Sequence, residues 1–183
     1  ELIILEMALK SSPSAIESQR RVTCWESYEG RTVVDFSFSH IDGGVAIEVK
    51  TSRSGREHHI GSLSQLAMPE DYQEGWLASL EVREVDHISG DTVADLTTRI
   101  IAGFEGSDEE VANLTRAFHN RLEMRGPACF DDRLHLILPE GGLRMIRMAD
   151  VPKPGMQPEI LDVEWTVDLS EAGFADTIGL LGT

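Results

Sequence analysis

The sequence lacks the residues that define several specialised classes of protein. Two of its 183 residues are cysteine, Cys24 and Cys129, which is too few for a disulfide framework, and their spacing does not suit a metal site. No run approaches the roughly 18 consecutive apolar residues that a membrane-spanning helix needs. These absences exclude a disulfide-dense mini-protein and a membrane span. We therefore expect a cytoplasmic protein with no membrane partner.

Basic residues are also scarce relative to acidic ones. The chain has 16 Lys and Arg against 32 Asp and Glu, a net charge of -16, and a surface of this sign repels the nucleic-acid backbone at long range. The excess is uneven, because residues 1–60 contain seven basic and nine acidic residues whereas residues 61–183 contain nine and 23. Electrostatics therefore argues against nucleic-acid binding mainly for the part after residue 60.

The length is typical of one domain, and 41% hydrophobic with 26% charged residues is a globular composition. Because the chain begins with Glu1 rather than Met, we expect it to be a piece of a longer chain that lacks its amino-terminal region. We place a core in residues 1–90 and a carboxy-terminal extension of helices and strands, including a β-hairpin, in residues 91–183. The order of elements indicates an α/β or α+β domain with a mixed sheet.

Hydrophobic periodicity and turn residues give the expected elements. Helices are predicted over residues 1–10, 15–25, 89–104 and 107–126, the third starting after a cap at Ser89 or Asp91 and the fourth after Ser107. Strands are predicted over residues 32–39, 45–52, 75–85 and 159–170. A short strand followed by a helical turn is expected within residues 60–68, and a hairpin over residues 133–151 around Gly141 and Gly142.

The strands over residues 32–39 and 45–52 carry the candidate chemistry. Each alternates apolar with polar residues, and the turn residues Asp42 and Gly43 between them predict a hairpin. On this pattern Asp35, Glu48 and Lys50 share one face of the sheet. Carboxylate oxygens suit a hard cation such as Mg²⁺ or Mn²⁺. The backbone carbonyl of Val49, between Glu48 and Lys50, is a further candidate ligand.

Such a cation lowers the pKa of a bound water and neutralises charge that develops on a phosphate oxygen. Lys50, two residues after Glu48 on the same face, would orient the water or stabilise the transition state. The residue types therefore suit phosphodiester hydrolysis. The competing interpretation of these three residues is a cross-strand salt bridge on a solvated sheet face, which is common and contributes little stability.

The segment from VDFSFS through IEVKTS to HHIGSLSQL resembles the core of PD-(D/E)XK nucleases. Together with the opening ELIILE and the segment CWESYEG, it resembles more closely a bacterial family known as PD-(D/E)XK motif proteins. Asp35 matches the first acid of the motif, Glu48 the second and Lys50 the lysine. Val34 stands where the motif name has proline, a position that often departs from the pattern in this superfamily.

The resemblance implies a restriction-endonuclease-like core, with a mixed central sheet flanked by helices, and Mg²⁺-dependent cleavage of DNA in which Mn²⁺ can substitute. It also implies that Glu1 or Glu6 adds a carboxylate to the metal shell and that Gln65 is the polar residue after the third strand. A place in a restriction or anti-phage defence system follows as an expectation, with a helicase-like ATPase or a methyltransferase as partners. A homodimer is compatible with it, because two strands need two sites.

Further residues close to this segment are candidate substrate contacts. Arg53 and Arg56 follow the catalytic strand and would bind phosphate, while His58 and His59 would contact phosphate or the scissile region. Ser62, three residues before Gln65, would help to position metal or substrate. The alternative is a charged loop with no function in binding. For the whole chain, the alternative function is an inactive nuclease-fold module whose acidic surface binds a basic partner.

Overall fold

The computed structural model describes residues 1–25, 34–39, 43–68, 70–86, 89–124, 135–155 and 164–175. Contacts divide the chain into two compact units. The first unit comprises residues 1–32, 84–137 and 178–183, and the second comprises residues 33–83 and 138–177. Each unit therefore draws on both sides of residue 90, where the sequence suggested the end of the core.

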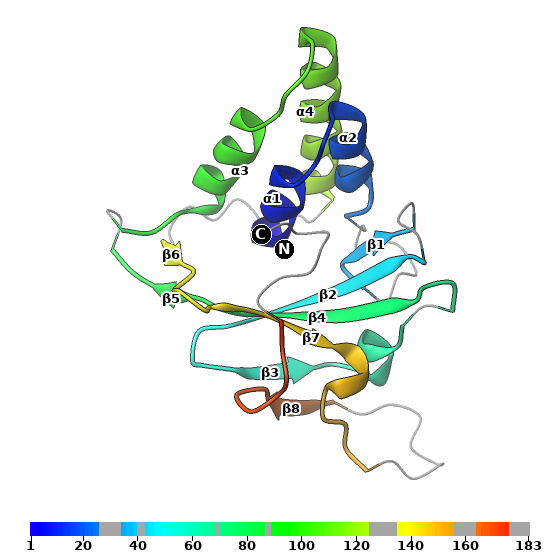
Figure 1. Cartoon of the computed structure of the whole chain (residues 1–183). Coiled ribbons are helices and arrows are strands. Elements are labelled where there is room, and N and C mark those ends of the chain that lie inside the picture. The colour runs from blue at the N-terminus through cyan, green and yellow to red at the C-terminus, as the bar shows by residue number, and fades with distance from the viewer. Residues whose placement is uncertain are drawn as a thin grey trace. The chain divides into compact units, whose positions relative to one another are not determined.

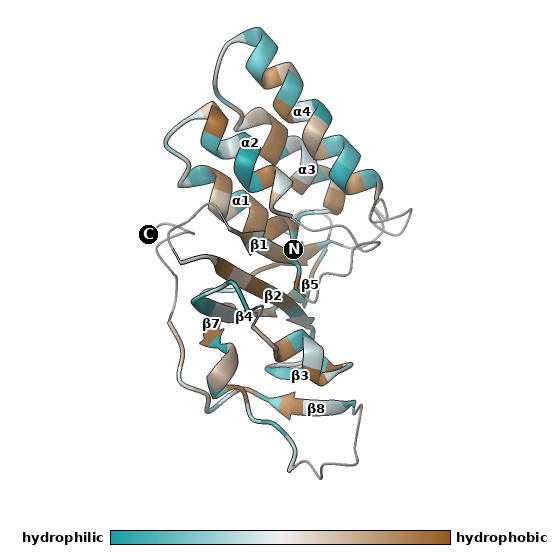
Figure 2. Cartoon of the chain, turned by 90° about the vertical axis from the view of Figure 1, so that its right-hand side faces the viewer, coloured by the Kyte–Doolittle hydropathy of each residue, from teal (hydrophilic) through white to brown (hydrophobic). Residues whose placement is uncertain are grey.

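Among the described residues, the first unit contains four α-helices, and each lies within its predicted range. They are α1 (Leu2–Lys10), α2 (Ala15–Thr23), α3 (Val93–Ala102) and α4 (Asp108–Glu123). Helix α1 contacts α2 and α3, and α2 contacts α4. Figure 2 shows the alternation of hydrophilic and hydrophobic residues along α4, which lets one side of the helix pack while the other meets water.

Capping side chains fix where these helices begin. Ser14 accepts a hydrogen bond from the backbone of Glu17, and Ser107 forms a capping box with Glu110 as the sequence predicted. For α3 the prediction of Ser89 or Asp91 was wrong, because Thr92 is the cap and forms a capping box with Asp95. A cap of this kind stabilises a helix by about 1 kcal/mol.

An aromatic cluster fills the core of the first unit. Trp25 is 1% exposed, and its ring stacks on Phe118 with 6.1 Å between ring centroids. Phe104 meets the same phenylalanine edge-on, also at 6.1 Å. The tryptophan is therefore a core residue that ties the end of α2 to α4.

A mixed four-stranded sheet forms the second unit, with the strand order β1-β2-β4-β7 (Figure 1). The strands are β1 (Phe36–Phe38), β2 (Val45–Ser52), β4 (Glu74–Glu81) and β7 (Leu143–Arg147). The outer pairs are antiparallel, and β2 runs parallel to β4. A parallel pair needs a long connection, and residues 53–73 supply it.

That connection and a later segment form a second layer on the sheet. Strand β3 (Glu57–Ile60) pairs antiparallel with β8 (Trp165–Asp168), and the 3₁₀ turn η1 (Leu63–Leu66) follows β3. Buried apolar side chains from both layers form one core cluster: Ile60, Leu66, Leu77, Ile146, Val151, Val167 and Leu169. This layer encloses the sheet face that carries Glu48 and Lys50.

The turn predicted at Gly141 and Gly142 forms, but its two flanking strands do not pair with each other. Strand β6 (Leu136–Ile137) pairs with β5 (Arg83–Glu84), whereas β7 joins β4 in the main sheet. The predicted hairpin is thus replaced by a turn that leads from one sheet into another. Gly141 has a φ of +67°, a conformation that favours glycine.

Parts of the predicted elements lie outside the described residues: 32–33, 41–42, 125–126, 133–134 and 159–163. In the part of the chain that the structure describes, no helix has both the length and the apolar character to cross a membrane. The four helices and the mixed sheet of these residues confirm the predicted α/β class.

Candidate functional site

Asp35, Glu48 and Lys50 lie in the second unit, on or next to neighbouring strands. Because the antiparallel register pairs Phe36 with Ile47, one further step places Asp35 opposite Glu48. Glu48 and Lys50 are two residues apart in β2 and project from the same sheet face. The structure therefore brings together the three residues that the alternating pattern had placed on one face.

The carboxylate of Asp35 is anchored on the backbone of β2. Its Oδ2 accepts a hydrogen bond from the backbone N–H of Val49 at 2.7 Å. In a strand, the N–H and C=O of one residue point toward the same neighbouring strand. The carbonyl of Val49 therefore faces the edge of β2 where Asp35 lies, so that a carboxylate and a carbonyl oxygen are available on the same side.

Glu48, Lys50 and Gln65 form a connected polar group. Glu48 is 5% exposed, and its Oε1 lies 2.9 Å from Nζ of Lys50. The same ammonium donates to Oε1 of Gln65 at 3.1 Å, and the backbone N–H of Gly61 donates to that oxygen at 2.9 Å. Two donors thus fix the Gln65 amide, which in turn holds the lysine beside the buried carboxylate.

Gln65 reaches Lys50 because η1 begins only three residues after the end of β3. Ser62 is the residue just before this turn, and its hydroxyl lies 2.6 Å from the hydroxyl of Ser64. Gln65 therefore takes part in the polar group, whereas Ser62 contacts a serine on the exposed side of the turn. The function that the sequence suggested for Ser62 stays a prediction.

His58 is buried behind Lys50 and is held in its neutral form. It is 2% exposed, and its Nε2 lies 2.7 Å from the hydroxyl of Ser79. Burial, reinforced by the positive charges of Arg56 and Lys50, lowers the pKa of His58 from 6.5 to about 4. Arg56 also donates to this hydroxyl, at 3.1 Å, so Ser79 links the guanidinium and the imidazole.

Arg56 is an internal cross-link rather than a surface cation. Its guanidinium donates to the carbonyl of Ser79 at 2.8 Å, to the carbonyl of Gly142 at 3.0 Å and also to the carbonyl of Gly141. Burial and the nearby charge of Arg144 lower its pKa, which Glu81 partly opposes. The sequence suggested that Arg56 and His58 contact phosphate, but in the structure both side chains are buried inside the second unit. Their role as substrate contacts stays a prediction.

The other two expected substrate contacts, Arg53 and His59, are exposed. Nε2 of His59 lies 3.7 Å from the carboxylate of Glu164, and both side chains are more than 60% exposed. An ion pair this exposed contributes little to stability. Arg53 and His59 are therefore the two candidate contacts whose side chains reach solvent.

Glu1 and Glu6, expected as further metal ligands, belong to the first unit. Oε2 of Glu1 accepts from the indole N–H of Trp25 at 2.6 Å. Glu6 lies 2.6 Å from Arg99 and 3.0 Å from Lys10. Burial tends to raise the pKa of Glu6, but the hydrogen bonds from Arg99 and Lys10 outweigh it and lower the pKa. Both carboxylates thus have partners within this unit, and their metal role stays a prediction.

Ser79 is a residue of this site that the sequence did not reveal. It is fully buried and pairs in register with Lys50, and its hydroxyl contacts both Arg56 and His58. A signal was available in the segment WLASLE, where a serine stands on the strand face that otherwise carries Leu77. A buried hydroxyl in an apolar strand needs a partner, but the sequence could not identify which one.

The oxygens of Asp35, Glu48 and Val49 fit a hard divalent cation. Mg²⁺ keeps several waters and needs only one or two protein carboxylates beside substrate phosphate. Within the described ranges, no group of three or more His, Cys, Asp and Glu side chains could hold a metal ion, and the ligand role of the Val49 carbonyl stays a prediction. The lysine beside Glu48 balances the buried negative charge when no cation is bound.

The fold and this polar group define a class, the α/β proteins with a restriction-endonuclease-like fold. A family model described as "Putative PD-(D/E)XK family member, (DUF4420)" matches residues 1–170, which is most of the chain. The chain therefore belongs to this family. PD-(D/E)XK nucleases generally use divalent metals. Searches of curated proteins and of solved structures each found no match.

Proposed function

We propose that the chain is a metal-dependent endonuclease that hydrolyses phosphodiester bonds in DNA. The observation that supports this most strongly is the grouping of Asp35, Glu48 and Lys50, with 2.9 Å between the last two, on adjoining strands of the mixed sheet. A solvated salt bridge does not account for it, because Glu48 is buried and Lys50 is also bound by Gln65.

Asp35, Glu48 and the carbonyl of Val49 would hold Mg²⁺, for which Mn²⁺ can substitute. When bound, the cation neutralises charge on the scissile phosphate and makes a water molecule more acidic. The hydrogen bond from the Val49 N–H keeps Asp35 against β2, so the carboxylate is oriented before any ligand arrives. Such pre-organisation lowers the cost of assembling the site.

Lys50 acts on the charge that develops during hydrolysis. An ammonium has three N–H bonds, and Glu48 and Gln65 accept two of them. The third is directed by these two and donates to a phosphate oxygen or to the attacking water. Its positive charge then stabilises the transition state, in a site where little bulk water screens the interaction.

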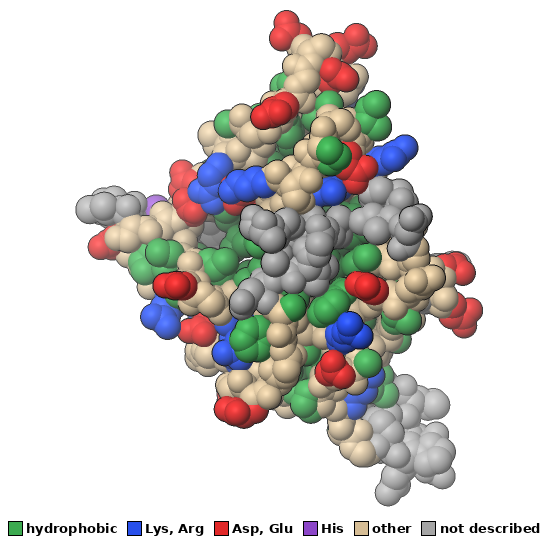
Figure 3. Space-filling model, viewed as in Figure 1, with side chains coloured by type: hydrophobic (Ala, Val, Ile, Leu, Met, Phe, Trp, Pro, Cys, Tyr) green, Lys and Arg blue, Asp and Glu red, His purple; other side chains and the backbone are tan. Residues whose placement is uncertain are grey.

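Capture of DNA by the chain alone is expected to be weak. On the face of the molecule in Figure 3, Lys and Arg side chains lie in small groups between Asp and Glu, and the described residues form no broad basic surface there. Arg53 and His59 supply local contacts. We propose that a further region of a longer chain, or a helicase-like ATPase or methyltransferase of a restriction or anti-phage system, delivers the DNA, with a homodimer cutting both strands.

The test is cleavage of supercoiled plasmid DNA by the full chain with Mg²⁺ or Mn²⁺. We expect nicking by the wild type, loss of nicking in Lys50→Met, and wild-type nicking in Lys10→Met, whose lysine is 69% exposed. Thermal unfolding of the three proteins checks that each is folded. Undiminished nicking by folded Lys50→Met protein would exclude the assigned role of this lysine.

The acid excess after residue 60 favours a second candidate, an inactive module that binds a basic partner. Calorimetric titration with Mn²⁺ separates the two functions. Heat of binding that disappears in Glu48→Ala supports the nuclease, since the module has no need of a cation there. Absence of heat in the wild type and in the variant supports the module.

A further inference from the structure

A cavity in the second unit has no function in the proposed hydrolysis. Its volume is about 400 Å³, within the roughly 300–1,000 Å³ of small-molecule sites. It opens where β4 begins and β7 ends, next to the short turn η3 (Met148–Asp150). The side chains that matter for what it could bind are Met68, Glu74, Trp76, Arg147, Met148 and Lys153.

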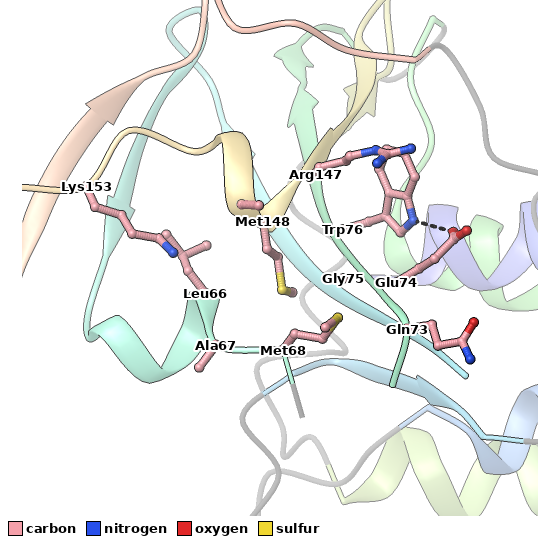
Figure 4. A pocket seen from close by; sticks show the side chains of 11 residues that line it. Leu66, Ala67, Met68, Gln73, Glu74, Gly75, Trp76, Arg147, Met148 and Lys153 are labelled. Carbon is pink, nitrogen blue, oxygen red and sulfur yellow. Dashed lines mark hydrogen bonds between the residues drawn. The ribbon is translucent and has the colours of Figure 1, made fainter. Parts of the chain in front are cut away.

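The floor of the cavity is apolar and is formed by flexible methionine side chains. Figure 4 shows the thioethers of Met68 and Met148 facing each other beside Gly75. A Cβ atom on Gly75 would lie 2.9 Å from the sulfur of Met148 and 3.3 Å from Met68, so a larger residue here would displace the Met148 thioether. Polarizable sulfur atoms over a flat backbone favour a planar, aromatic ligand.

One wall is an aromatic and cationic pair. The guanidinium of Arg147 lies 5.5 Å from the ring centroid of Trp76, and the indole N–H donates to Glu74 at 3.0 Å. Figure 4 shows Lys153 on the opposite side of the cavity. These side chains supply two positive charges and one negative charge, although the chain as a whole carries -16. The cavity therefore suits an anion that has an aromatic part.

The cavity lies at the end of the sheet, close to the candidate catalytic residues: Gly75 is on their sheet face, whereas Trp76 and Arg147 project from the other face. Gly75 pairs in register with Ala46, which is two residues before Glu48. With a rise of about 3.3 Å per residue and about 4.8 Å between strands, Gly75 lies roughly 8 Å from Glu48 along the sheet. Leu66 of the cavity also directly follows Gln65, which binds Lys50. One nucleotide of a strand spans a comparable distance.

We infer that this cavity binds an unstacked nucleobase together with its phosphate. The base lies over the methionines, and the positive charges of Arg147 and Lys153, on opposite sides of the cavity, attract the phosphate. The base could belong to a DNA strand or to a free nucleotide, and both have the same binding chemistry. The first source rests on the proposed function, because it presumes that the neighbouring residues cut that strand.

Binding is measured by fluorescence anisotropy with a labelled 12-mer of thymidylate, in the presence of a chelator and in the Lys50→Met background, so that no cleavage occurs. Arg147→Glu reverses one charge of the cavity, and Ala149→Trp fills it from an exposed position. We expect each to weaken binding at least about 10-fold, whereas Arg83→Glu, at a side chain 64% exposed, changes it less than about twofold.

Competition identifies the source of the base. Displacement by thymidine monophosphate at micromolar concentration indicates a free nucleotide, and displacement only by single-stranded DNA indicates a strand. Absence of 12-mer binding to the parent protein overturns the inference. So does equal binding by parent, Arg147→Glu and Ala149→Trp proteins.

Plasmid nicking keeps this result separate from the proposed function. If the wild type nicks plasmid and the cavity variants bind the 12-mer as well as the parent does, the nuclease function stands and the cavity proposal is wrong. If the cavity variants bind the 12-mer more weakly but the wild type never nicks plasmid, the cavity is a nucleotide site and the nuclease function is wrong.

Discussion

Glu6 in the first unit and Glu48 in the second are both buried carboxylates, 8% and 5% exposed, but they have different partners. Arg99 binds both oxygens of Glu6, at 2.6 and 3.2 Å, and Lys10 adds a contact at 3.0 Å. Glu48 contacts Lys50 at 2.9 Å. A forked guanidinium holds one carboxylate, whereas an ammonium on a flexible stem lies beside the other.

The difference indicates which carboxylate can exchange its partner for a metal ion. A bidentate arginine pair fixes both the position and the orientation of a carboxylate, and it is lost only if two hydrogen bonds break together. A lysine is a point charge that can move aside by rotation of its side chain. We therefore expect Glu6 to stabilise the helices and Glu48 to bind the cation.

The largest expected effect comes from the matched changes Glu48→Gln and Glu6→Gln. Loss of a ligand charge at Glu48 should lower the cleavage rate roughly 100-fold or more and remove the heat of Mn²⁺ binding. Glu6→Gln should stay within about threefold of the wild-type rate. Loss of Mn²⁺ heat in both variants would contradict the comparison and make Glu6 a ligand, as the resemblance implied.

The second comparison lies within one loop, between Arg56 and Arg53. Arg56→Met leaves the carbonyls of Ser79, Gly141 and Gly142 without their donor, which should cost about 2–4 kcal/mol in the free energy of unfolding. Arg53→Met, at an exposed side chain, should cost less than about 0.5 kcal/mol. Urea denaturation of the two variants measures both values, and equal costs would show that Arg56 is not a structural cross-link.

The sequence predicted the strands and the face of Asp35, Glu48 and Lys50 because alternation has a period of two and a hairpin register follows from it. It also predicted α4, whose cap at Ser107 is a local pattern. These are features that a residue and its near neighbours determine. They cover the four helices of the described residues and the pairing of β1 with β2, but not the pairing of β7 with β4.

The sequence could not distinguish Arg56 from Arg53. Both stand in the same charged stretch, and only the pairing of β4 with β7 brings the carbonyls of Ser79 and Gly142 to Arg56. The surroundings of His58 have the same origin, because its ring meets Ser79 of β4 and its strand pairs with β8, more than 100 residues further along the chain. Partners so distant in sequence leave no local pattern.

His58 provides the third prediction, a dependence of stability on pH. Its pKa is about 4 in the folded protein and 6.5 when unfolded, so the unfolded chain binds the proton more tightly. Stability should therefore fall as the pH decreases from above 6.5 to about 4, by up to about 3 kcal/mol from this group. His58→Phe removes this titrating group. The free energy of unfolding, measured by urea denaturation at pH 7.5 and 4.5, should therefore differ less between the two pH values than in the wild type.

Carboxylates of both proteins titrate at the lower pH, so only the difference between the two pH dependences reports on His58. If the wild type and His58→Phe lose the same stability between the two pH values, then the histidine is not held neutral inside the unit.

The smallest expected effect returns to Glu6. Because Arg99 is 43% and Lys10 69% exposed, solvent screens their attraction, and Glu6→Gln should lower the free energy of unfolding at pH 7 by only about 1–2 kcal/mol. The folded pKa of Glu6 lies below 4.5, so this stability should decline as the pH falls below that value. Glu105→Gln, at an exposed carboxylate of the same unit, is the control and should change stability by less than about 0.5 kcal/mol. Equal effects of the two variants at pH 7 would mean that the arginine fork gives Glu6 no advantage over a surface carboxylate, and the contrast with Glu48 would then be lost, since both carboxylates are buried to a similar degree.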